Sequence, residues 1–258
     1  MFPSANDASH PFEGIYEKLK RADENIVNLN DEILQFFKES KYPVIPDVKD
    51  KSWQDAVNYH RDLQVPKRFS VLAGEIIHHL RSCLDHVVWH FSSNTARLPH
   101  ENALEFPIFS EPLTKDELRR YNRKIQGITK PNVLTIIKQL QPYQRGADAG
   151  NDPLRIVHDM DRFDKHRELA IVTASCQVEF PAGTSINLVN KAVAYTQGEA
   201  VPKDVLAAIG TQIKKHHHVT PDIAFAQVGK WKTQPVVPSL MKLMNAVDDV
   251  IELFAAEV

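Results

Sequence analysis

The chain lacks the features that mark several protein classes. It has only two cysteines in 258 residues, Cys83 and Cys176. These provide no disulfide framework and fit a reducing compartment. Because no run of about 18 apolar residues occurs, we expect no membrane-spanning helix. The first residues, MFPSANDASHPFEG, show no basic segment followed by an apolar one, so we expect no signal peptide and a cytoplasmic protein.

Charge and motifs exclude further classes. A formal net charge of −2 and an isoelectric point of about 6.6 exclude a polybasic protein held to nucleic acid by its overall charge, while a local basic groove stays open. The sequence has no glycine-rich phosphate loop, no G-x-S-x-G elbow and no HExxH, which excludes P-loop, α/β-hydrolase and zincin classes. With 43% hydrophobic residues the chain can bury a full core, and we predict a single domain, residues 1–258.

Hydrophobic periodicity predicts a mainly helical protein. Apolar residues recur at steps of three and four from Phe12 to Phe36 and from Leu72 to Phe91, which predicts two long helices within a bundle at 11–166. Thr114 and Glu117 form the pattern of a capping box at the start of a shorter helix. A last apolar stripe predicts a C-terminal helix at 237–257 that returns to the bundle.

Segments rich in β-branched residues predict a smaller strand region. Residues 42–64 contain prolines and an alternating stretch, which indicates a possible hairpin. Residues 167–230 contain three runs rich in Val, Ile, Thr and Phe, separated by turn residues. The predicted fold class is therefore α+β, mainly α, with a helical bundle core and a small antiparallel β-sheet inserted before the C-terminal helix.

Polar residues gather on one side of the predicted helix at 72–91. At about 100° per residue, four side chains fall within roughly 60° of one another and form a first stripe: Glu75, His79, His86 and His90. His78, Arg81 and Asp85 lie on the adjacent stripe. One chemistry that could use the first stripe is metal binding, since it contains two i, i+4 pairs, with further ligands from His158, Asp161 or His166. The four alternative metal ligands are Glu75, His79, His86 and His90.

A second chemistry is phosphoryl transfer at RNA. An imidazole such as His86 can exchange the proton of a 2′-hydroxyl or a 5′-oxygen, and an arginine such as Arg81 can hold the phosphate. The two residues point about 140° apart on a straight helix, so a cleft between two facing helices, and hence a dimer, would bring them together better. Asp85 would orient His78 or Arg81; it is also a natural i, i+4 ion-pair partner for Arg81.

The segment RSCLDH, Arg81 to His86, resembles the R-x4-H motif of the HEPN superfamily (higher eukaryotes and prokaryotes nucleotide-binding). The resemblance implies a helical bundle, a homodimer and metal-independent endoribonuclease activity of the toxin, antiphage or RNA-processing kind, without a cofactor. A toxin-type protein would have a cognate antitoxin as a partner, and RNA or a nucleotide as a ligand. Arg81 would bind phosphate and His86 would be the acid and base. Ser82 departs from the family, which more often has Asn there.

A longer stretch, Gly74 to Glu168, resembles a group of bacterial proteins that carry GExxHxLRSxLDH, FPIF, LQPY and DKHR in the same order. That group brings no established activity with it. The resemblance draws attention to the DKHR segment, which could meet the 72–91 helix in space. The supporting polar site predicted around Arg81, His86 and Asp85 therefore comprises Ser82, His78, His79, Asp164, Lys165, His166 and Arg167.

A non-catalytic interpretation explains the same residues. RSCLDH could be an interhelical polar lock in a module that binds a nucleotide, an RNA or a partner protein. In the predicted helix near 115–124, four basic residues surround Tyr121, which could track a phosphate backbone with one stacking ring or could simply be a charged helix face. The sequence alone does not separate catalysis from binding.

Overall fold

The structure is a computed structural model that describes residues 10–40, 64–100, 103–166, 169, 171–179, 185–187, 219–225 and 234–258. Most of these residues are helical, as predicted. The chain divides into two compact units: one comprises Met1–Ile26, Gly74–Arg167 and Leu240–Val258, and the other comprises Val27–Ala73 and Glu168–Ser239. The domain boundaries expected from the sequence stay predictions.

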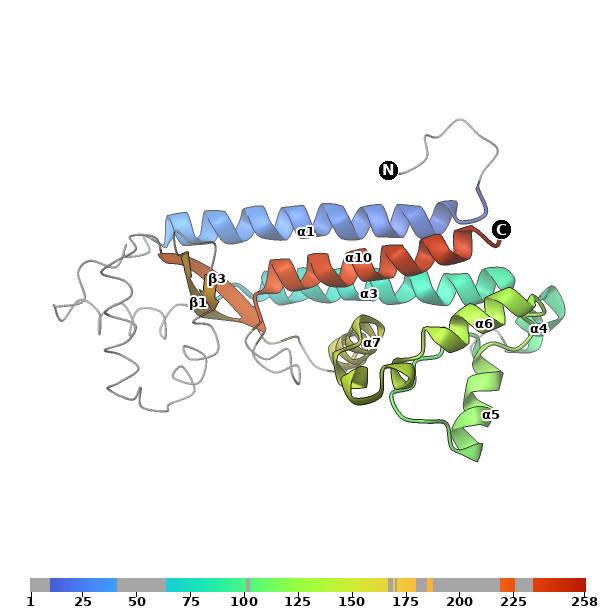
Figure 1. Cartoon of the computed structure of the whole chain (residues 1–258). Helices are drawn as coiled ribbons and strands as arrows, with labels where there is room; N and C mark the ends of the chain where they lie inside the picture. The colour runs from blue at the N-terminus through green and yellow to red at the C-terminus, as the bar shows by residue number, and fades with distance from the viewer. Residues whose placement is uncertain are drawn as a thin grey trace. The chain divides into compact units, whose positions relative to one another are not determined.

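Three long helices and several short ones make up the helical part (Figure 1). No helix in the described ranges is both long and apolar enough to cross a membrane. The long helices are α1 (Glu13–Glu39), α3 (Lys67–Phe91) and α10 (Val236–Ala255). The short ones are α4 (Asn94–His100), α5 (Lys115–Lys124), α6 (Pro131–Gln139), the 3-10 helix η2 (Pro142–Asn151) and α7 (Pro153–Asp164).

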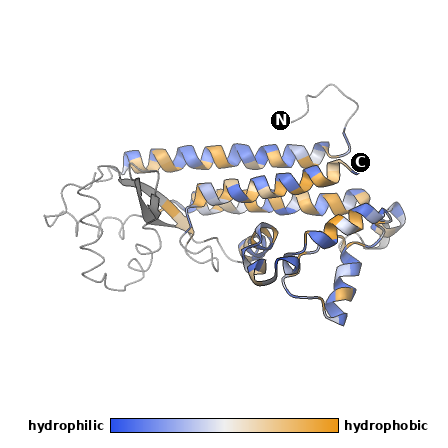
Figure 2. Cartoon of the chain, in the orientation of Figure 1, coloured by the Kyte–Doolittle hydropathy of each residue, from blue (hydrophilic) through white to orange (hydrophobic). Residues whose placement is uncertain are grey.

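In the first unit, the parts of α1, α3 and α10 that belong to it run side by side (Figure 1). The Cys83 thiol contacts the Ile15 carbonyl at 3.6 Å, and the rings of Phe91 and Phe254 are 6.2 Å apart. Figure 2 shows the alternation of apolar and polar residues along these helices. The core they form includes Ile15, Leu19, Ala22, Ile76, Leu80, Leu84, Val87, Leu243, Val247 and Ile251, each at most 3% exposed.

The apolar stripe predicted for the first helix is mostly correct. Its members from Phe12 to Ile33 are buried, but in the last turn Phe37 is buried and Phe36 is only half-buried. One residue of difference at a helix end fits a stripe that drifts slowly around a straight helix, because 3.6 residues per turn does not match a repeat of 3.5.

Local capping explains where two of the shorter helices begin. The capping box predicted at Thr114 and Glu117 is confirmed: each side chain binds the other's backbone N–H at the start of α5. At α7, the Asp152 carboxylate accepts hydrogen bonds from the N–H groups of Leu154 and Arg155, and Pro153 occupies the first turn, where it costs no hydrogen bond. These caps fix the start of the helix that carries Asp161.

Three strands are described in the second unit: β1 (Ile171–Glu179), β2 (Ser185–Asn187) and β3 (Val219–Phe225). They pair antiparallel in the order β2-β1-β3, and a register shift between Thr173 and Ser175 interrupts the β1–β3 ladder. The hairpin predicted at 42–64 falls almost entirely outside the described residues, as does most of the rest of 167–230.

Candidate functional site

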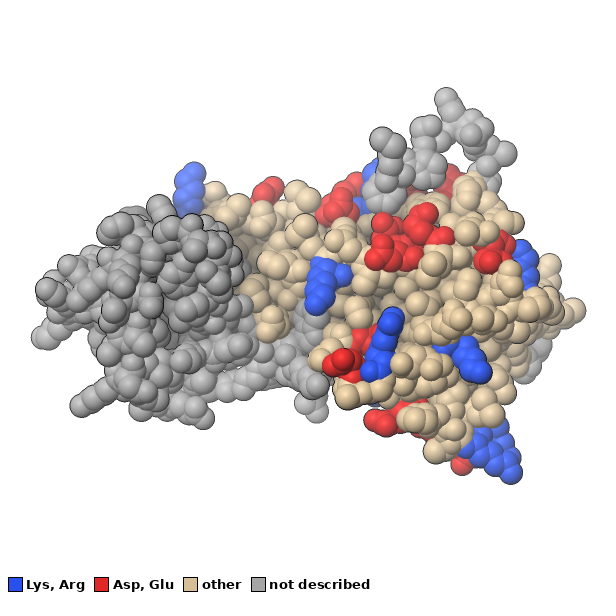
Figure 3. Space-filling model, in the orientation of Figure 1, with Lys and Arg blue, Asp and Glu red and all other residues tan. Residues whose placement is uncertain are grey.

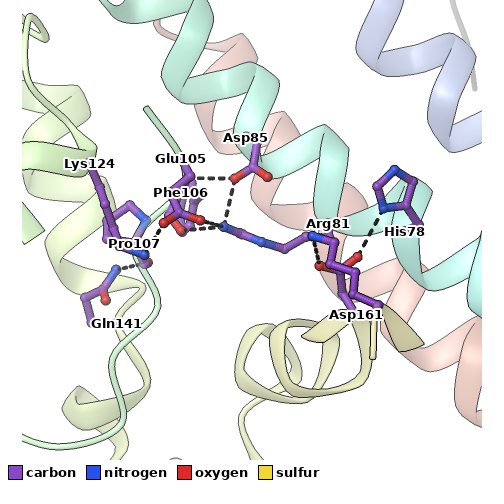
Figure 4. Close-up of polar contacts among 10 residues, drawn as sticks. His78, Arg81, Asp85, Glu105, Phe106, Pro107, Lys124, Gln141 and Asp161 are labelled. Atoms are coloured by element: carbon purple, nitrogen blue, oxygen red, sulfur yellow. Dashed lines mark hydrogen bonds and ion pairs between the residues drawn. The ribbon is translucent and has the colours of Figure 1, made fainter. Parts of the chain in front are cut away.

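Arg81 lies in the middle of α3 and is buried, with 3% of its surface exposed. Its Nη2 atom is 2.8 Å from Asp85 Oδ1 and donates to the Phe106 carbonyl at 2.8 Å. Glu105 Oε2 lies 3.5 Å from the same nitrogen. Figure 4 shows the guanidinium reaching from α3 to the segment 105–107. The positive charge of Arg81 is thus paired with groups of its own chain.

Asp85 completes this contact from one turn further along α3. Its Oδ1 accepts from Arg81 and from the Phe106 N–H, the latter at 2.8 Å. Burial raises the pKa of Asp85, and the Arg81 charge and the Phe106 N–H oppose that rise. The N–H and the carbonyl of Phe106 are therefore both satisfied by side chains of α3, which buried backbone groups require. We call Arg81, Asp85, Glu105 and Phe106 the polar lock.

The segment that the polar lock holds has a second anchor at the end of α6. Gln141 is fully buried; its Nε2 donates to the Pro107 carbonyl at 2.8 Å, and its Oε1 accepts from the Phe109 N–H at 3.2 Å. Phe106, Pro107 and Phe109 thus gain polar partners from side chains of α3 and from Gln141. The FPIF and LQPY segments noted in the sequence, with RSCLDH, belong to one hydrogen-bonded network.

Lys124 of α5 closes the network on its outer side. Its ammonium pairs with Glu105. Burial alone would raise the pKa of Glu105, but the hydrogen bond and charge of Lys124 outweigh it, so the pKa lies below its usual range. Tyr121 on the same helix is only 8% exposed. Its ring is therefore not presented for stacking on a nucleic-acid base.

A separate polar cluster joins α3 to the end of α7. His78 Nδ1 lies 3.1 Å from Asp161 Oδ1, and Lys165 Nζ lies 2.7 Å from Asp161 Oδ2. The Asp161 side chain is 5% exposed, whereas those of His78 and Lys165 are 60% and 56% exposed. Figure 4 shows the imidazole pointing toward this carboxylate. Asp161, rather than Asp85, is the carboxylate beside His78.

The DKHR segment begins where α7 ends against α3. A Cβ atom added to Gly74 would lie 2.5 Å from Asp164 Oδ1, so the Asp164 carboxylate would have to move to admit one. Lys165 shares Asp161 with His78. His166 is exposed, and Arg167 lies outside the described residues. The expected approach of this segment to the 72–91 helix therefore holds for Asp164 and Lys165.

The other histidines of α3 lie on a different side from Arg81. His86 is exposed; partial burial, followed by the charge of Lys18 on α1, lowers its pKa. The same two causes lower the pKa of His79, whose buried Nδ1 has no hydrogen-bond partner among the described residues. Lys18 affects both imidazoles, whereas Arg81 points to 105–106. The structure does not bring Arg81 and His86 together within one chain.

Three remaining candidates of α3 are also placed. The His90 ring lies edge-on to Phe12, 5.1 Å between centroids, and partial burial lowers its pKa. Ser82, which follows Arg81, is half-buried. Glu75 is exposed. Among the residues that the structure describes, no three His, Cys, Asp and Glu side chains are grouped to hold a metal ion, so the metal site expected at Glu75, His79, His86 and His90 gains no support.

Sequence reasoning missed most of the residues that surround Arg81. Glu105, Phe106 and Gln141 were not candidates, and Asp161 and His158 were considered only as metal ligands. His158 is half-buried, and its Nδ1 has no hydrogen-bond partner in the part of the chain that the structure describes. Burial, followed by the charges of Arg81 and Lys124, lowers its pKa to about 4. The signal that could have found Phe106 and Gln141 was the joint occurrence of the FPIF and LQPY segments with RSCLDH.

The HEPN resemblance concerns six residues, Arg81 to His86, of which Arg81, Cys83 and Leu84 are buried. A buried motif of this kind does not distinguish a family from a well-packed helix. No protein-family model matches the sequence, and no curated protein or solved structure shows significant similarity to the chain.

Proposed function

We propose that this chain cleaves or processes RNA without a metal ion, as a HEPN-like protein. The observation that carries the proposal is the exposure of two imidazoles, His78 and His86, on the helix that bears the R-x4-H segment. Metal-independent cleavage of RNA requires a group that moves protons near neutral pH, and imidazole is the usual one.

The proposal differs from the HEPN pattern at Arg81. A guanidinium that is 3% exposed and bound to Asp85 and the Phe106 carbonyl is not free to contact a phosphate. A second copy of the chain could not reach it either, because the lock buries it inside one chain. In this proposal Arg81 and Asp85 hold the segment 105–107 in place, and exposed side chains contact the substrate.

The surface limits how RNA would be held. Among the described residues on the face drawn in Figure 3, Lys and Arg side chains are scattered among acidic and neutral ones and form no continuous basic tract. Contacts with phosphates on this face would therefore come from single cations placed near the site. A homodimer, a cytoplasmic location, a cognate antitoxin and a sheet that spans the 167–230 segment remain parts of this proposal.

The experiment is cleavage of labelled total tRNA and mRNA in excess EDTA by the full chain. We expect cutting that EDTA does not prevent, because the proposed chemistry uses no metal. Cutting that appears only after a divalent metal is added would favour a metal enzyme instead. RNA left intact under both conditions would contradict the proposal.

A second candidate is a non-catalytic module that binds a nucleotide, an RNA or a partner protein. The burial of Arg81 in the polar lock favours it, because the residue that the resemblance assigns to phosphate has a structural partner set instead. Under this candidate, labelled RNA would be retained by the protein in a filter-binding assay and recovered uncut.

A further inference from the structure

Asp161 of α7 and His78 of α3 form a pair in which a buried carboxylate contacts an exposed imidazole. Among the residues that the structure describes, it is the one such pair near the R-x4-H segment. Asp161 is nearly inaccessible, and its two oxygens have different partners, His78 on Oδ1 and Lys165 on Oδ2. A carboxylate can only accept from the nearer ring nitrogen, so Nδ1 of His78 carries the proton. The Nε2 atom is then the ring's proton acceptor, on a side chain that is 60% exposed.

Lys165 adds a positive charge beside this imidazole. It is the C-cap residue of α7, where a cation is favourable, and its side chain is 56% exposed. Since both groups contact one carboxylate, the ammonium and the imidazole lie within reach of one phosphodiester. An ammonium placed there can contact a non-bridging oxygen and stabilise charge that develops on it.

His86 has no comparable support. Within the described part of the chain, its ring makes no hydrogen bond or ion pair with a carboxylate, and its neighbour Lys18 is a cation that disfavours the protonated ring. An acid and base must be oriented as well as exposed. Exposure alone does not separate His78 from His86, but the Asp161 contact does.

We infer that His78 is the general base of the proposed RNA cleavage, that Asp161 positions it, and that Lys165 binds the phosphate. The inference rests on the proposed function. His78 Nε2 takes the proton of the 2′-hydroxyl, and the 2′-oxygen bonds to phosphorus. The bond from phosphorus to O5′ breaks with its electron pair on O5′, which takes a proton from water, and the hydroxide left behind neutralises the imidazolium. The products are a 2′,3′-cyclic phosphate and a 5′-hydroxyl.

Cleavage kinetics on a labelled RNA in EDTA test the roles. We expect His78→Gln to lower the single-turnover rate by at least about 100-fold, which is the usual contribution of an acid or base. Asp161→Asn should lower kcat with KM unchanged, and Lys165→Met should raise KM. The matched control is His10→Gln, because His10 is also an exposed histidine of the same unit. Circular dichroism checks that each variant is folded.

The outcomes separate this inference from the proposed function. If wild type and His78→Gln cut equally well, or if only His86→Gln loses cutting, the assignment to His78 is overturned and the proposed function stands. If wild type cuts nothing, the proposed function fails, and ring spectra of ¹⁵N-labelled histidine decide whether the site exists.

The spectra have a definite expectation. His78 should show the tautomer with hydrogen on Nδ1, Asp161→Asn should shift it toward the other tautomer, and uridine 3′-monophosphate should move the signals of His78 but not those of His10. A wild-type ring protonated on Nε2 alone, or one indifferent to the nucleotide, would overturn the site even if the chain cuts RNA.

Discussion

Replacing Arg81 with methionine should destabilise the first unit strongly. The substitution keeps much of the side-chain volume but removes the guanidinium, which leaves the Phe106 carbonyl without its side-chain donor and Asp85 with only the Phe106 N–H. Breaking a buried ion pair by removing one member costs about 3–5 kcal/mol. The Asp85 side chain is 32% exposed, so water relieves part of its loss. We therefore expect a loss of about 3 kcal/mol in the free energy of unfolding, at the lower end of that range.

Urea denaturation at neutral pH measures this loss, and Arg21→Met is the control. Arg21 pairs with Glu24 at 3.2 Å, but both side chains are about half exposed, 59% and 47%. Such surface pairs contribute about 0–1 kcal/mol, so the same substitution should have little effect there. The comparison separates the loss of a buried charge from the loss of an arginine as such.

A double-mutant cycle with Asp85→Asn identifies the partner. Residues in direct contact show coupling energies of about 0.5–3 kcal/mol, whereas distant residues add independently. We expect Arg81→Met and Asp85→Asn to be coupled within that range. An Arg81→Met protein within about 0.5 kcal/mol of wild type, which is the usual size of a harmless surface change, would refute the polar lock. It would also restore Arg81 as a candidate for phosphate binding.

Two further predictions concern neighbouring contacts. The pKa of His158 is lowered to about 4 from 6.5, so between these pH values the folded state binds fewer protons than the unfolded state. The free energy of unfolding should therefore fall by about 3 kcal/mol in all as the pH is lowered from about 6.5 to about 4. His158→Gln should flatten this pH dependence in urea denaturation, and an unchanged slope would contradict the prediction. Gly74→Ala should lose about 1 kcal/mol, at the lower end of the overpacking range, because its Cβ would displace the Asp164 carboxylate, which lies at the end of a side chain that can shift. Gly14→Ala, with open space around it, should be neutral or gain up to about 1 kcal/mol. Equal thermal midpoints for the two alanine variants would show that α7 does not contact Gly74.

The helices were predictable because their signals are local. The apolar steps from Phe12 to Ile33 predict the buried face of α1, and the Thr114 and Glu117 pattern predicts the start of α5. Periodicity also places Arg81 and Asp85 on one stripe of α3, where they do pair. Each of these depends only on the geometry of a single helix.

The partners of that stripe were not predictable in the same way. Phe106 is 25 residues from Arg81, and Asp161 is 83 residues from His78. No helical rule relates positions that far apart, because the contact depends on how the short helices pack against α3. The expectation that Asp85 would orient His78 or Arg81 was therefore met for Arg81, whereas a carboxylate of α7 lies beside His78.

Burial gives two neighbouring residues of one stripe of α3, Arg81 and His78, different roles. Arg81 and His78 are three residues apart, less than one turn, yet Arg81 is covered by the segment 105–107 and His78 is 60% exposed. A buried guanidinium whose Nη2 is bound to Asp85 and the Phe106 carbonyl stabilises the fold and has almost no surface to offer a substrate. An exposed imidazole on a buried carboxylate contributes little to stability but presents an oriented nitrogen. Substitution of Arg81 should therefore lower the stability of the fold, whereas substitution of His78 should lower the rate of cleavage. If the two variants showed the reverse, the roles assigned to the two residues would have to be exchanged.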